Sequence, residues 1–84
     1  MSTVKIDGRH ILAARDLLKM TQEDLAEAAG VSRLSVFNAE NGKTVTRSTT
    51  LDKIREALER RGIEFMNGDS PGVRLHPSKA IIPV

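Results

Sequence analysis

The sequence predicts a mainly α-helical fold of four helices, followed by a short two-stranded β element. Up to residue 62, apolar residues recur at helical spacing, and Ser, Thr and Gly stand where helices begin and end. After residue 62 the pattern changes to two short β-prone segments around a polar loop. A chain of 84 residues is too short for a second core. We therefore expect a helical part over residues 1–62 and a β element with a tail over residues 63–84.

Residues 9–19 carry the apolar pattern of a first helix. Ile11, Ala14, Leu17 and Leu18 recur there at helical spacing, which is typical of an amphipathic helix. We expect these four side chains to face the core.

The segment Thr21–Gly42 has the pattern of two short helices joined by a sharp turn. Thr21 is the predicted N-cap of the first, and its spacing to Asp24 is a variant of the capping box. Gly30 accepts the left-handed backbone that a sharp helix exit requires. Ser32 is the predicted N-cap of the second helix, which Gly42 can end.

The small and apolar residues of the same segment fit a steep helix crossing. Ala26 is small enough to stand where two helix backbones meet. Leu25, Val31 and Val36 are expected to fix the crossing by packing between the helices. Residues 21–42 therefore predict a helix-turn-helix.

A longer fourth helix is predicted after a polar loop. Ser48 or Thr49 is expected to cap it, and Gly62 follows its end. Its apolar stripe consists of Leu51, Ile54, Ala57 and Leu58.

Residues 63–66 and 73–75 are β-prone and predict two short strands joined by a six-residue turn. An isolated hairpin is marginal in water, so it must pack on the helices or on another subunit. The tail, residues 76–84, is either a frayed end or an arm that docks on a partner.

The composition excludes several classes of protein. There is no cysteine, so neither a disulfide framework nor a thiolate zinc site is expected. The first ten residues lack the apolar run of a signal peptide, and no stretch approaches the ~20 apolar residues of a membrane span. We expect a soluble, cytoplasmic protein that does not contact membranes.

Catalysis is not expected from this sequence. His10 and His76 are the only histidines, one placed before the first helix and one in the tail. No metal-binding spacing or phosphate-cradling glycine loop accompanies them. We expect no enzyme activity, cofactor, metal ion or small-molecule ligand.

Basic charge is concentrated on the second half of the helix-turn-helix and the loop after it. Residues 31–50 carry Arg33, Lys43 and Arg47 against Glu40 alone, although the net charge of the chain is only +2. This distribution favours a phosphate backbone as the partner.

The region from Ile11 to about Leu58 resembles the lambda-repressor-like DNA-binding domains of the Cro/repressor (XRE) family. The matching residues are Arg15, Gln22 to Ala26, Gly30 to Ser32, Val36, Glu40 and Gly42. Residues 62–75 are also similar to the ending of a short subgroup of these regulators. The resemblance implies a lambda-repressor-like helix-turn-helix fold and a transcriptional regulator of double-stranded DNA, most simply a dimeric repressor that reads a palindromic operator.

The resemblance also implies roles for single residues. Arg15 and Glu40 match a partly buried structural salt bridge. The helix Ser32–Asn41 would enter the major groove. Contacts to the DNA phosphates are expected from Gln22, Ser32, Asn41, Lys43, Thr44 and Arg47.

The candidates for base reading are Arg33, Leu34, Ser35, Phe37 and Asn38. Arg33 could bond to guanine or to a phosphate. Leu34 could contact a thymine methyl group or simply be exposed, and Phe37 could contact DNA or pack under the following loop. Asn38 could read adenine or bind a phosphate. Leu34 and Phe37 are apolar where the family commonly has polar residues, so the operator sequence stays open.

A homodimer is expected because one such domain reads too few base pairs for a unique site. Six apolar residues after the fourth helix would leave more apolar surface than a small monomer exposes. We therefore expect the dimer interface at Ile63, Phe65, Val73, Leu75, Ile81 and Ile82.

The alternative function is a protein-interaction module that sequesters another regulator, in the manner of an antiactivator or antitoxin. The apolar Leu34 and Phe37 favour it, whereas Arg33, Lys43 and Arg47 favour DNA.

Overall fold

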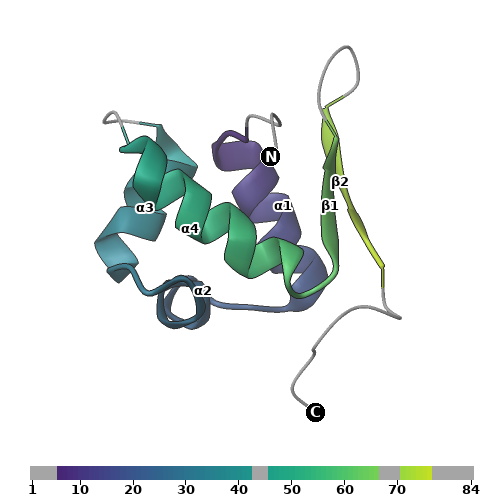
Figure 1. The fold of residues 1–84 in the computed structure, drawn as a ribbon, viewed down its shortest axis with the longest axis horizontal. Coiled ribbons are helices and arrows are strands. Elements are labelled where there is room, and N and C mark those ends of the chain that lie inside the picture. The colour runs from purple at the N-terminus through teal and green to yellow at the C-terminus, as the bar shows by residue number, and fades with distance from the viewer. Residues whose placement is uncertain (1–5, 43–45, 67–70, 77–84) are drawn as a thin grey trace.

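The computed structural model describes residues 6–42, 46–66 and 71–76. Figure 1 shows four helices and one β hairpin along this part of the chain. Their bounds are Gly8–Leu18 for α1, Gln22–Ala29 for α2, Arg33–Asn41 for α3, Ser48–Glu59 for α4, Ile63–Met66 for β1 and Gly72–Leu75 for β2. The predicted fold class, mainly α with a two-stranded β element, is confirmed.

The predicted caps of α2 and α3 are confirmed. The Thr21 side chain accepts a hydrogen bond from the Asp24 backbone N–H, and Asp24 accepts one in return from the Thr21 N–H. The Ser32 hydroxyl accepts from the Ser35 N–H at 3.0 Å. Gly30 ends α2 with a φ of 70°, where a side chain would be strained. These local contacts fix the ends of both helices.

The start of α4 differs from the expectation. Its N-cap is Arg47, whose extended backbone precedes the first helical residue, and no side chain caps the helix. Ser48 and Thr49 lie inside the first turn, so the predicted cap was wrong by at least one residue. Ser48 and Thr49, which predicted the start of this helix, are themselves helical.

His10 also lies elsewhere than expected, in the first turn of α1 rather than before it. Asp7 caps this helix, and His10 completes the capping box from the third helical position. The Asp7 backbone N–H donates to His10 Nδ1 at 3.1 Å, so Nε2 carries the ring hydrogen and donates to the Met66 carbonyl at 3.2 Å. The buried ring therefore joins the start of α1 to the end of β1.

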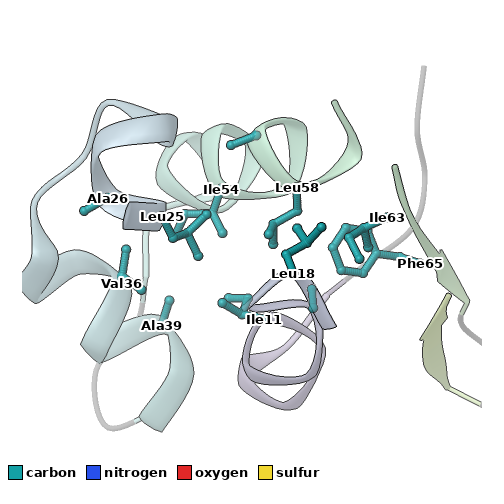
Figure 2. Packing of buried hydrophobic residues seen from close by; sticks show 12 residues of the cluster. Ile11, Leu18, Leu25, Ala26, Val36, Ala39, Ile54, Leu58, Ile63 and Phe65 are labelled. Carbon is teal, nitrogen blue, oxygen red and sulfur yellow. The ribbon is translucent and has the colours of Figure 1, made fainter. Parts of the chain in front are cut away.

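The core lies between the four helices and the inner face of the hairpin (Figure 2). Its largest fully buried side chains are Ile11, Leu25, Val36, Ile54 and Leu58, which come from all four helices.

Leu17 was wrongly expected to face this core, and its side chain is 45% exposed. It follows Ile11 by six residues, roughly 240° around the helix, while Ala14 and Leu18 stay on the buried side.

The hairpin packs against α1 and α4, on the opposite side of the molecule from α3 (Figure 1). Its strands are antiparallel, and the register pairs Ile63 with Leu75 and Phe65 with Val73. These four side chains share one face because side chains alternate along a strand. Ile63 and Phe65 are buried in the core, and Val73 and Leu75 are half-buried against it.

This packing corrects the basis of the expected dimer interface. Ile63 and Phe65 are only 4% and 6% exposed, so they leave no free apolar surface for a second subunit. The α1–α4 core covers them because the hairpin folds back onto its own helices. Ile81 and Ile82 lie outside the described residues.

Candidate nucleic-acid interface

The packing of the helix-turn-helix places its residues in the roles that their sizes predict. Leu25 and Val36 are fully buried, and Ala26 is 6% exposed at the α2–α3 contact. Val31, in the turn, packs against the same core. α3 is thereby held with one side inward and the other toward solvent.

An ion pair between Arg15 on α1 and Glu40 on α3 fixes the end of α3, as expected. Arg15 Nε lies 2.6 Å from Glu40 Oε2, and Nη2 lies 3.0 Å from Oε1. The third donor, Nη1, reaches the Met20 carbonyl at 2.9 Å. The two side chains are only 14% and 7% exposed, and the hydrogen bonds with Glu40 raise the pKa of Arg15. Both charges thus have partners in a nearly dry site.

Gln22, the first residue of α2, belongs to the same network. Its Nε2 donates to Glu40 Oε1 at 3.0 Å, an interaction that the sequence reading missed. An amide nitrogen has a second hydrogen, so this bond does not exclude a phosphate contact. Gln22 therefore links the start of α2 to the end of α3 through Glu40.

An open hollow of about 590 Å³ lies at the start of α2. Its charged lining residues are the bases Arg15, Lys19 and Arg33 and the acid Glu23, and Arg15 is already paired with Glu40. Thr21 and Gln22 lie at the helix terminus itself. Arg33 begins α3, so the hollow adjoins both helices of the motif. Lys19 was missed by the sequence reading, although it is a basic residue two positions before the α2 N-cap. Cations around a helix N-terminus suit an anionic group.

The outer face of α3 carries the candidate base-reading residues. Arg33, Leu34 and Phe37 are exposed, with 64% of Leu34 and 39% of Phe37 accessible. Ser35 and Asn38 are half-buried.

Three polar candidates, Ser32, Ser35 and Asn41, make hydrogen bonds within the motif. Ser35 Oγ lies 2.8 Å from Ser32 Oγ, and Asn41 Nδ2 donates to the Phe37 carbonyl at 2.7 Å.

The remaining phosphate candidates follow α3. Arg47 is exposed directly before α4. Lys43 and Thr44 lie outside the described residues. The candidate interface that the structure describes therefore consists of the outer face of α3 and the hollow at α2, with Arg47 exposed at the start of α4.

Among residues 6–42, 46–66 and 71–76, no group of three His, Asp or Glu side chains is placed to hold a metal ion. None of the helices in these ranges combines the length and apolar composition that crossing a bilayer requires.

The two capped helices, the buried ion pair at their end and the exposed outer face of α3 define a helix-turn-helix DNA-binding domain. Residues 11–65 match a family model described as helix-turn-helix. The match covers more than half of the chain, so the chain belongs to the Cro/C1-type (XRE) helix-turn-helix family and is a DNA-binding regulator. A comparison with curated proteins finds no match.

Proposed function

We propose that the chain is a sequence-specific repressor that binds a palindromic operator as a homodimer, with α3 in the major groove. The observation that supports this best is that Arg33 belongs both to the exposed face of α3 and to the basic hollow at α2. A DNA backbone held in the hollow would place the start of α3 against the base edges.

In this arrangement, different residues read the bases and bind the phosphates. Bases are read by Arg33, Leu34, Ser35, Phe37 and Asn38. Phosphates are held by Gln22, Ser32, Asn41, Lys43, Thr44 and Arg47, which fix the register without reading sequence. Repression follows most simply from occupying a promoter.

Selection of duplexes from a random-sequence pool tests the proposal. The full chain is expected to enrich a palindrome whose half-sites are centred roughly 34 Å apart on one face of the duplex. A reporter promoter that carries the selected site should then lose expression when the chain is present. Recovery of no common sequence contradicts sequence-specific binding.

For the dimer, we propose that the seam between α1 and β2 and the tail supply the contact. Val73 and Leu75 are half-buried there, and β2 is paired on one edge only within the described residues. Ala13 lines a cavity together with Val73, so Leu17, one turn later on α1, lies on the same side of the helix. Ile81 and Ile82 would extend this surface.

The variant Leu17→Glu tests this interface. It is expected to shift the dimer toward monomer in sedimentation velocity, because a charge would be buried without a partner. Leu12→Glu is the matched control, since Leu12 has the same exposure, 46% against 45%, on another side of α1. Deletion of residues 77–84 tests the tail and leaves every core residue of the described part of the chain in place. An undiminished dimer in both variants contradicts the proposed contact.

The second candidate function, a module that sequesters another regulator, is favoured by the exposure of Leu34 and Phe37. It predicts that the chain binds no duplex DNA.

A further inference from the structure

Two of the four large apolar side chains that are exposed in the described residues stand together on α3. Leu34 and Phe37 are three residues apart, so their side chains are neighbours on one face of the helix. The other two, Leu12 and Leu17, lie on α1. The outer face of the proposed recognition helix thus carries two adjacent exposed apolar side chains.

Some of the polar side chains that accompany Leu34 and Phe37 on α3 already make hydrogen bonds within the helix-turn-helix. Ser35 is bonded to Ser32, and the Asn41 amide is bonded to the carbonyl of Phe37 itself. Fewer donors and acceptors therefore face outward than the composition of α3 suggests, while the apolar area stays free.

The basic residues around this apolar face favour DNA as the molecule that binds it. Arg33 precedes Leu34 directly and lines the hollow with Lys19, and Arg47 is exposed ten residues after Phe37 in the chain. An apolar patch bordered by cations is complementary to a groove bordered by phosphates.

Within the major groove, the C5-methyl group of thymine is the apolar group on the base-pair edges. We infer that Leu34 and Phe37 determine specificity by packing against thymine methyl groups, so the operator carries thymine at the positions under this pair. This inference rests on the proposed function and names the chemical feature that the same interface reads.

The test uses a duplex selected by the full chain from a random-sequence pool. Each thymine is replaced in turn by deoxyuridine, which lacks the methyl group and keeps every hydrogen-bonding atom. Binding is expected to weaken about fourfold for each contacted methyl group, the effect of losing one buried methylene-sized group. Deoxyuridine at the remaining thymine positions should leave the affinity unchanged.

Three variants make the result specific. Leu34→Ala and Phe37→Ala should each lose the preference for thymine over deoxyuridine at the position that the replaced side chain contacts, whereas Leu12→Ala, which changes an exposed leucine elsewhere, should keep the wild-type preference. Equal binding of both duplexes by the wild-type chain overturns the inference and leaves the proposed function intact. Failure to select any duplex overturns both, and binding unchanged by the α3 variants assigns the pair to a protein partner instead.

Discussion

Arg15 and Glu40 are 25 residues apart in the chain, and their ion pair is almost dry. The bases in the exposed interface, Arg33 and Arg47, are separate from this pair. At the residue scale, the buried ion pair therefore holds α3 in place, and the exposed Arg33 and Arg47 stay available to bind DNA.

Replacing one member of the buried pair should be costly. Arg15→Ala is expected to lower the free energy of unfolding by about 3–5 kcal/mol, because Glu40 is left buried without its main partner. Gln22→Ala removes one hydrogen bond and should cost about 1–3 kcal/mol. The matched control is Arg9→Ala, which breaks an exposed pair with Asp7 and should cost less than about 1 kcal/mol. Urea denaturation measures all three, and equal effects of the two arginine variants would contradict the account.

Asp7 should make stability depend on pH in acid. The hydrogen bond from Arg9 and those from the backbone N–H groups of His10 and Arg9 lower its pKa from 3.8 to about 2. Its charged form is favoured in the folded state, so its contribution is present above pH 4 and is lost as the pH falls from about 4 to 2. The contribution is small because 49% of the side chain is exposed.

The variant Asp7→Asn keeps a capping side chain and does not titrate. Thermal midpoints measured from pH 2 to 5 should therefore converge for the variant and the wild-type chain at the acid end. A constant difference across this range would contradict the pKa assignment.

At the scale of elements, the start of α1 is the point where three parts of the molecule meet. Gly8 lies against the backbone at the end of α3, and His10 bonds the end of β1. The ring of His10 also meets the edge of Phe65, with centroids 6.0 Å apart. α1 therefore ties the hairpin to the helix that carries the proposed base-reading residues.

Thermal unfolding of the variant Gly8→Ala tests the close approach of α1 to the end of α3. A Cβ at this position would lie 2.0 Å from the Glu40 carbonyl oxygen, so α1 and α3 would have to move apart. The variant should lose about 1–3 kcal/mol of stability, although alanine normally stabilises a helix. At Gly72 the described residue that an added Cβ would meet is Met66, whose Cε would lie 3.7 Å away, so Gly72→Ala should be nearly neutral in the same thermal unfolding experiment.

The elements also show what local sequence can predict. The caps at Thr21 and Ser32 were predicted correctly because each depends on residues three positions away. His10 was misplaced because its capping box uses a histidine where glutamate or glutamine is usual. Leu17 and Leu18 are adjacent and equally apolar, and Leu18 is the one buried because it lies on the same side of α1 as Ile11 and Ala14.

Local sequence likewise predicts only part of the hairpin packing and of the candidate interface. Alternation along β1 predicts that Ile63 and Phe65 share a face, but it does not say whether the chain's own helices or a partner covers that face. The outward position of Phe37 followed from helical periodicity. The bond between Gln22 and Glu40 did not, because it depends on how α3 lies against α1 and α2.

At the scale of the whole molecule, the hairpin and α3 lie on opposite sides of the helical core (Figure 1). The proposed dimer contact and the proposed DNA contact therefore do not compete for one surface. The buried network and the core hold the two sides in a fixed relation, as reading two half-sites at a set spacing requires.

The most direct test of the central claim is a salt titration of binding to duplex DNA, followed by fluorescence anisotropy. The logarithm of affinity should fall linearly with the logarithm of salt, with a slope of about −0.9 for each phosphate that a Lys or Arg side chain neutralises. Arg33→Ala should weaken binding, whereas Arg74→Ala, on the outer face of the hairpin, should not. No measurable binding at low salt, or an affinity independent of salt, would contradict the assignment of α3 and the basic hollow to DNA.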